Sequence, residues 1–376
     1  MFNRLYIGFL LLSSFPIHAS ESDVEADSRS PEDPQQSTSF DLGGAIRFNY
    51  GWKDYSADSN GSFDFELFRI DFKARHKNWF FDGQYRWYKD FDAIHHAFIG
   101  YQIDDTQHIT AGVSQVPFGI EPYASHSFWF GGTYYLGLED DYDLGVAWRK
   151  VFDNKQLDLA YFTGSEYSPG EYGRYSFDVA AVGETQTKED GQLNARLQYS
   201  PKPNHTLGIS TQLGQIKNTQ TGISGDHWAM GAHYDGHIEQ WNLQAQLVKY
   251  RYDNKPGLNT GDYRLNLSAF LFPFEIATDA WVTSLNAART FETNNRFADS
   301  ITCYNNATIT TPADRPGLAD SIQNVSGCLF VKGGLYTYVD WIAGKNMWFA
   351  GGPGVGIYDG ETGWHSRLNI NFGYYF

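Results

Sequence analysis

Long runs in which every second residue is apolar constrain this chain more than any other feature of its sequence. Such runs extend from Phe40 to Trp52, from Phe68 to Arg75 and from Trp364 to Phe376, the C-terminal residue. Side chains in a β-strand point alternately to the two faces of the sheet, so this period predicts strands with one apolar and one polar face. Strands of soluble sandwiches are usually shorter than these runs. The pattern therefore favours a sheet that contacts lipid on one face and water on the other.

The composition supports the same interpretation. Aromatic residues make up 17% of the chain, yet its mean hydropathy is -0.46. A soluble protein with so many aromatic residues would bury them beside Leu, Ile and Val, and a helical membrane protein would have a positive mean hydropathy. A closed barrel explains both values, since half of each strand faces lipid and half faces water. The sequence thus predicts an all-β fold, an antiparallel transmembrane β-barrel.

The N-terminus has the features of a secretory signal peptide. Arg4 precedes an apolar core from Leu5 to Phe15, and Ala19 ends a candidate cleavage site. This core is too short to span a bilayer as a helix, and the alternative is a buried N-terminal helix. We predict a cleaved signal peptide over 1–19, a flexible acidic periplasmic leader over 20–39 and the barrel over 40–376.

The same alternation divides the remaining chain into sixteen predicted strands. They are 40–52, 63–76, 79–89, 93–103, 107–114, 142–152, 155–163, 191–200, 204–217, 225–236, 238–252, 262–273, 276–291, 327–342, 346–358 and 363–376. Every second connection is short, including those predicted at 76–78, 272–274 and 344–345, while 115–141, 164–190 and 292–326 are long and polar. Short periplasmic turns that alternate with longer outer loops are typical of outer-membrane barrels.

Two further features bear on the environment of the chain. Cys303 and Cys328 flank a polar stretch, and in an exported protein we expect them to form one disulfide in a loop. The formal net charge of -16 argues against nucleic acid as a partner, because nucleic-acid binding requires a basic face.

Several short motifs in the first part of the barrel resemble the porin O/P family, the phosphate-selective porins and their relatives. The matching segments are Arg69–Ala74, Phe98–Tyr101, Thr110–Gly112, Val116–Glu121 and Asp143–Val146. The C-terminal Phe376 is also similar to the signal that bacterial barrels present to their insertion machinery. The resemblance implies sixteen strands, a homotrimer and a third extracellular loop folded into the pore. It also implies that anion or phosphate selectivity occurs in some relatives.

On the first three predicted strands, charged residues alternate with Phe and Ile. Their side chains would therefore point to the opposite face of the sheet and line the channel. They are Arg47, Arg69, Asp71, Lys73, Arg75 and Arg86. A charge facing lipid at mid-membrane costs about 2–4 kcal/mol, which favours their placement in the lumen. We predict that this basic wall and Glu121 of the long loop 115–141 contact solutes across a constriction. The alternative is that these residues pair with loop carboxylates and only hold the loop in place.

Two further segments contain residue types that occur in metal sites or in hydrolases. The acidic run from Glu139 to Asp143 has residue types that suit Ca²⁺, but such a run is more often a solvated loop end, and we predict no metal and no cofactor. Ser125, His126 and Ser127 supply the residue types of a hydrolase, yet adjacent side chains on an extended segment point apart. We therefore predict no catalytic residues.

The function predicted from the sequence is that of an outer-membrane porin in a bacterial cell. Its partners would be outer-membrane lipid, small hydrophilic solutes and ions, and two further copies of the chain in a homotrimer. The basic wall predicts a weak preference for anions such as phosphate. The alternatives are a barrel enzyme of the lipase or protease type and a structural or adhesin barrel without a channel.

Overall fold

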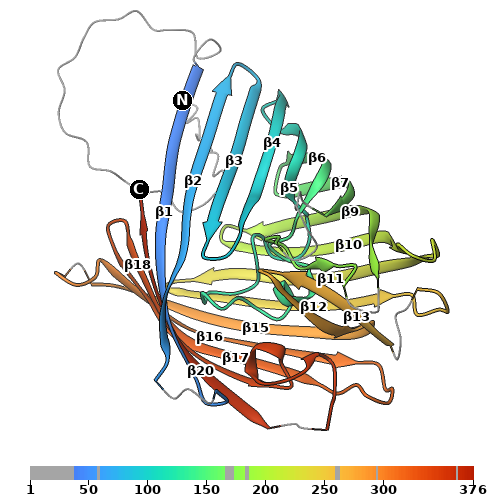
Figure 1. Cartoon of the computed structure of the whole chain (residues 1–376). Helices are drawn as coiled ribbons and strands as arrows, with labels where there is room; N and C mark the ends of the chain where they lie inside the picture. The colour runs from blue at the N-terminus through green and yellow to red at the C-terminus, as the bar shows by residue number, and fades with distance from the viewer. Residues whose placement is uncertain are drawn as a thin grey trace, which may run out of the picture. The chain divides into compact units, whose positions relative to one another are not determined.

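A closed barrel accounts for most of the chain. The computed structural model describes residues 38–56, 60–165, 173–182, 186–258, 263–293, 295–360 and 363–376. Within them, sixteen strands form a closed barrel, and each pairs antiparallel with its neighbours (Figure 1). The predicted fold class is therefore confirmed. The predicted signal peptide lies outside the described residues, and the predicted leader does so except for Thr38 and Ser39, which begin the first strand.

The barrel strands follow one another in chain order. They are β1 (Thr38–Lys53), β2 (Ser62–His76), β3 (Trp79–Tyr88), β4 (Asp92–Asp104), β5 (Gln107–Gln115), β6 (Tyr142–Phe152), β7 (Lys155–Ser165), β9 (Thr187–Lys202), β10 (His205–Asn218), β11 (Ser224–Ile238), β12 (Trp241–Tyr252), β15 (Asp279–Glu292), β16 (Ser300–Pro312), β17 (Ser321–Lys332), β18 (Leu335–Lys345) and β20 (Trp364–Tyr375). Pairing of β1 with β20 closes the barrel. No helix in the described part of the chain is long and apolar enough to cross a membrane.

The barrel is apolar on its outer face and polar on its inner face. On β9, Leu193 is 57% exposed whereas its neighbour Asn194 is 3% exposed. On β15, Leu285 is 60% exposed whereas Ser284 is 1% exposed. A soluble protein has the reverse arrangement, and a continuous exposed apolar surface of this kind requires an apolar partner or medium.

Two of the predicted strands belong to the connections rather than to the barrel. The range 262–273 contains β13 (Arg264–Ala269), which pairs with β14 (Phe272–Ala277) in a hairpin. With β8 (Asp178–Val179) and β19 (Gly354–Val355), this hairpin forms a separate four-stranded sheet, so the predicted short turn at 272–274 is wrong. The range 346–358 is wrong for the same reason, since it contains the short η3 (Trp348–Ala350) and β19. Alternation in these segments reflects packing between connections and not contact with lipid.

The strand boundaries near the C-terminus also differ from the prediction. The range 327–342 joins the second half of β17 to most of β18, and the real turn lies at 333–334 rather than at 344–345. β16 lies within the predicted loop 292–326. The outward positions of β16 include Cys303, Asn305 and Ala307. The strand therefore lacks the regular series of large apolar residues that marks β1 and β20. The predicted number of sixteen is right because two false strands offset two missed ones.

Cys303 and Cys328 form a disulfide between two barrel strands. They are directly opposite each other in the pairing of β16 with β17, with a Cα–Cα distance of 4.0 Å. The expectation that this bond lies in a loop is therefore wrong. It failed because the polar stretch between the cysteines contains most of the missed strand β16 and the start of β17.

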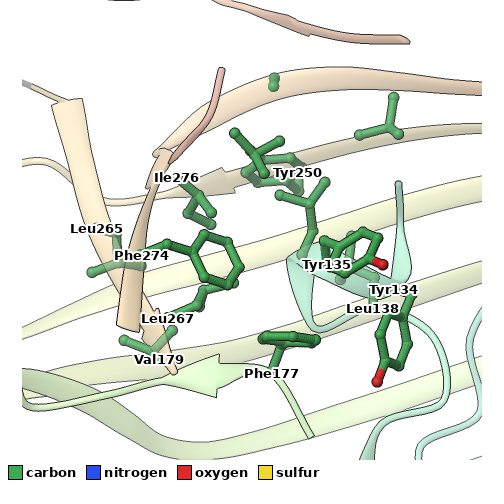
Figure 2. Close-up of a cluster of buried hydrophobic side chains, with 14 of the residues drawn as sticks. Tyr134, Tyr135, Leu138, Phe177, Val179, Tyr250, Leu265, Leu267, Phe274 and Ile276 are labelled. Carbon is green, nitrogen blue, oxygen red and sulfur yellow. The ribbon is translucent and has the colours of Figure 1, made fainter. Parts of the chain in front are cut away.

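Several long connections share one hydrophobic core (Figure 2). Connection 116–141 contributes η1 (Tyr134–Leu136), and connection 166–186 contributes Phe177 and Val179. The hairpin of β13 and β14 contributes Leu267 and Phe274, whose side chains are directed toward the same cluster in Figure 2. Burial of these side chains gives the connections a fixed structure, because each buried aromatic or aliphatic side chain contributes about 1.5–3 kcal/mol.

Candidate functional site

The charged residues predicted on β1, β2 and β3 lie on the polar face of these strands. Arg69 is directly opposite Arg86, and Lys73 is directly opposite Asp82, in the pairing of β2 with β3. Arg75 is exposed and Arg86 is buried, while the half-buried group contains Arg47, Arg69, Asp71 and Lys73. The structure thus brings together the predicted basic residues of the first three strands.

Carboxylates from the same strands pair with three of these cations. Arg47 is 2.7 Å from Glu66, Arg69 is 3.1 Å from Asp71, and Lys73 is 3.4 Å from Asp82. For Arg75 and Arg86, no carboxylate of the described residues lies within 4.0 Å of a guanidinium nitrogen. The wall is therefore mixed in charge with a basic excess, rather than a continuous basic strip.

Aromatic rings from the long connections contact the same cations. The guanidinium carbon of Arg47 is 5.3 Å from the ring centre of Phe128, which belongs to connection 116–141. That of Arg86 is 4.4 Å from the ring centre of Tyr175, which belongs to connection 166–186. Cations at such distances are attracted to the face of an aromatic ring by about 0.5–2 kcal/mol. Two long connections are thus held against the charged wall.

The backbone of connection 116–141 is hydrogen-bonded to uncharged side chains of other barrel strands. These bonds join Gly119 N–H to Ser210 of β10 (3.0 Å), Ile120 N–H to Gln246 of β12 (3.1 Å), the amide of Asn286 of β15 to the Ala124 carbonyl (2.8 Å), Gly132 N–H to Thr308 of β16 (3.1 Å), and the amide of Gln323 of β17 to the Phe130 carbonyl (2.9 Å). Buried backbone groups need such partners. The polar faces of five strands therefore hold this connection in place.

Glu121 lies in a group of charges on β6, β7 and β9. One carboxylate oxygen of Glu121 is 3.0 Å from Arg149 and 3.2 Å from Arg196. Arg196 is also 3.2 Å from Asp158 and donates a hydrogen bond of 2.8 Å to the Gly119 carbonyl. The sequence prediction set Glu121 opposite the wall of β1 to β3, whereas its ion-pair partners lie on β6 and β9.

The end of connection 116–141 is acidic and buried. Glu139 accepts hydrogen bonds from the Thr133 hydroxyl (2.5 Å), the Ala124 N–H (3.1 Å) and the amide of Gln246, and burial raises its pKa to about 7. Asp140 accepts from the hydroxyls of Tyr142 and Tyr175, and burial raises its pKa to about 6. The four carboxylates between 139 and 143 are at most 4% exposed. The expectation of a solvated loop end is therefore wrong, because the connections fold over this segment.

The residue types of a hydrolase do not assemble at Ser125 and His126. The imidazole Nδ1 of His126 is 3.0 Å from the Asn306 amide oxygen, and its Nε2 bonds to Asn242. The Ser125 hydroxyl is 3.0 Å from the hydroxyl of Ser127. The described hydrogen bonds therefore join His126 to amides and not to a serine nucleophile.

Five charged residues of the site were absent from the sequence prediction: Glu66, Asp82, Arg149, Asp158 and Arg196. Four of them occupy inward positions of their strands, so the alternation itself was a signal for all but Glu66. Glu66 lies at a β-bulge, since Arg47 pairs with Leu67 while Phe48 pairs with Phe65. A bulge shifts the parity of a strand, and alternation does not predict its position.

Comparisons with known proteins reveal similarity of structure and not of sequence. No family model matches the chain, and no curated protein matches it either. Membership of the porin O/P family therefore stays a prediction.

Solved structures of bacterial outer-membrane proteins resemble the chain over most of its length. The outer-membrane channel DcaP of Acinetobacter baumannii matches with a TM-score of 0.60 and 13% identity, over 91% of this chain and 99% of that one. The anion-selective porin from Comamonas acidovorans matches with a TM-score of 0.56 and 10% identity, over 90% of this chain and 100% of that one. The trimer form of OmpT from Vibrio cholerae matches with a TM-score of 0.60 and 11% identity, over 91% of this chain and 100% of that one. At these identities the similarity shows the fold, and the chain has the closed barrel of these proteins.

Proposed function

We propose that the chain is a porin of the bacterial outer membrane that allows passive diffusion of small hydrophilic solutes and ions. The observation that carries this proposal is the exposed apolar face of a closed barrel whose inner face is polar. Only closed barrels and helices satisfy their backbone hydrogen bonds within lipid. A barrel of sixteen strands is wide enough to enclose an aqueous channel. Two of the similar structures, an outer-membrane channel and an anion-selective porin, support the same function.

Connection 116–141 is proposed to be the extracellular loop that narrows this channel. Its hydrogen bonds to β10, β12, β15, β16 and β17 support a path across the inside of the barrel. The side chains of these five strands that bond to it are uncharged, while Arg47, Arg69 and Lys73 of the charged wall stay partly exposed. Solutes would then pass along the part of this wall that the connections leave exposed.

The proposed selectivity is a weak preference for anions, including phosphate. Arg75 and Arg86 carry charges without a carboxylate within 4.0 Å in the described part of the chain, which supports a positive potential along the wall. The acidic net charge of the whole chain opposes it, but charges more than about 8–10 Å away are screened in physiological salt. Low-dielectric walls focus the nearby field and raise the concentration of counter-ions.

The environment and assembly follow from the same proposal. The chain would be exported by the signal peptide over 1–19, which is cleaved, and would insert into the outer membrane as a homotrimer. The trimer form of OmpT from Vibrio cholerae, which has a similar barrel, supports the trimer. No enzyme activity and no cofactor are proposed.

Reversal potentials in planar bilayers test the channel and its selectivity. Under a KCl gradient, the wild-type protein is expected to show a small preference for chloride. Replacing Arg69 and Lys73 by Gln removes the cations beside Asp71 and Asp82, so the reversal potential should move clearly toward that of potassium.

The matched control removes two cations outside the wall. Lys332 pairs with Asp299 at the end of β17, and Arg289 lies exposed on β15. Their replacement by Gln should leave the reversal potential unchanged. Absence of conductance would contradict the porin function, and a clear cation preference of the wild-type channel would contradict the proposed selectivity.

A further inference from the structure

Three buried aspartates from different segments meet beside β6. Asp141 ends connection 116–141, Asp143 is near the start of β6, and Asp178 belongs to β8 in connection 166–186. One carboxylate oxygen of each lies within 4.8 Å of the others, and none of the three residues is more than 2% exposed. Oxygens this close to one another lie within reach of a single ion.

The cluster gathers like charges in a buried place. Arg174, 3.2 Å from Asp178, brings one guanidinium to the three carboxylates. Glu189 of β9 adds a further repulsion with Asp178. Carboxylates buried this close to one another repel each other strongly. A divalent cation bound between them would offset that repulsion.

Two neutral oxygens beside the aspartates point to the same kind of ligand. Ser268 of β13 is 0% exposed and directly opposite Asp178 in the β8–β13 pairing, which places both side chains on one face about 4.5–5.5 Å apart. Its hydroxyl oxygen has no hydrogen-bond partner among the described residues. The amide nitrogen of Gln192, on β9, donates a hydrogen bond to Asp143, while the oxygen of the same amide is buried and has no described partner. Buried oxygens that accept no described hydrogen bond and lie beside a negatively charged cluster are suitable ligands for a hard cation.

We propose that Asp141, Asp143 and Asp178 bind a calcium ion, with Ser268 and Gln192 within reach as additional oxygen ligands. Calcium takes six to eight oxygens at about 2.3–2.6 Å, so two ligands on opposite sides of the ion lie about 4.8 Å apart. The three carboxylate oxygens lie within 4.8 Å of one another, so one calcium ion can contact all of them. Magnesium fits less well, because it requires near-octahedral geometry and usually keeps several waters.

The ion would join parts of the chain that are far apart in sequence. Asp141 and Asp178 belong to two long connections, Ser268 belongs to a third, and Asp143 and Gln192 belong to the barrel strands β6 and β9. Calcium would therefore tie the shared core of the connections to the barrel. Ligands that bind only the folded state stabilise it, so calcium should also protect these connections from proteolysis.

Calcium binding can be measured on the whole protein refolded in detergent, free of lipopolysaccharide and treated with EDTA. Isothermal titration with CaCl₂ should give saturable binding of one ion per chain, with at least tenfold weaker binding of MgCl₂. Terbium luminescence excited through nearby tyrosines should rise on binding and be displaced by calcium. Asp143→Asn and Asp178→Asn should each weaken calcium binding at least tenfold. Asp299→Asn, which changes an exposed carboxylate paired with Lys332, is the matched control and should bind like the wild type.

The proposal does not depend on conductance, since binding is measured in micelles. It is overturned if the folded wild-type protein shows no saturable calcium binding, which would mean that groups of the protein itself stabilise the cluster. Binding that survives both aspartate substitutions, or equal affinity for magnesium, would overturn it as well. If an aspartate variant fails to fold, Ser268→Ala, which changes only a short strand outside the barrel, should still weaken calcium binding severalfold, and unchanged affinity would count against the site.

Discussion

Replacing Leu285 by Arg is expected to lower the free energy of unfolding of the barrel by about 2–4 kcal/mol. Leu285 is 60% exposed on the outer face in the middle of β15, with Ala245 and Ala307 as its cross-strand neighbours. On a soluble protein an exposed Leu→Arg change is nearly neutral. In lipid the guanidinium loses its hydration, and the barrel is destabilised. Denaturant titration of the protein in phospholipid vesicles measures the difference.

Depth along the same strand provides the matched control. Phe291 has the same outward parity as Leu285 but lies at the end of β15, and Phe291→Arg should cost only about 0–1 kcal/mol because the side chain reaches the interface. Leu285→Ala separates the loss of apolar area from the added charge. Equal tolerance of Arg at both positions would mean that this face does not contact hydrocarbon, and the porin proposal would lose its main support.

The sequence predicted the barrel where the outer face is strongly apolar. β1 and β20 have an apolar residue at nearly every outward position, so the period of two located them within a few residues. The prediction failed at β16, where Cys303 and Asn305 occupy outward positions. It also failed at β13, whose alternating Leu265 and Leu267 pack in the core of the connections. Alternation shows that the two faces of a strand lie in different environments. It does not show whether the apolar face contacts lipid or a protein core.

The candidate site was predictable to a smaller extent. Parity placed Arg47, Arg69 and Lys73 on one polar face, because every strand contributes its inward residues in a fixed register. The carboxylate partner of Arg47 depends on the bulge at Glu66, which has no sequence pattern of its own. The hydrogen bonds of connection 116–141 join residues more than 90 positions apart, as for Gly119 and Ser210. Such pairings follow from closure of the barrel, and no local sequence pattern predicts them.

Replacing Arg196 by Met is expected to lower the free energy of unfolding by about 3 kcal/mol, since removing one partner of a buried ion pair typically costs about 3–5 kcal/mol. Arg196 is 2% exposed and bonds to Glu121, Asp158 and the Gly119 carbonyl. Without it, two carboxylates share the single cation of Arg149, which places the loss at the lower end of that range. The hydrogen bond that attaches connection 116–141 to the barrel at the Gly119 carbonyl would also be lost. Because the connection would then move more, single-channel recordings should show larger current fluctuations. Denaturant titration measures the loss of stability in the same samples.

A second substitution separates charge imbalance from loss of packing. Asp158→Asn in the Arg196→Met background restores the balance between Glu121 and Arg149, so the double variant should be more stable than Arg196→Met alone. Arg251→Met is the control for removal of an arginine, because Arg251 is exposed on β12 and should change the free energy of unfolding by no more than about 0.5 kcal/mol. If Arg196→Met costs no more than Arg251→Met, the charges around Glu121 do not hold the connection. The constriction would then have to depend on the five hydrogen bonds to uncharged side chains and on the hydrophobic core behind them.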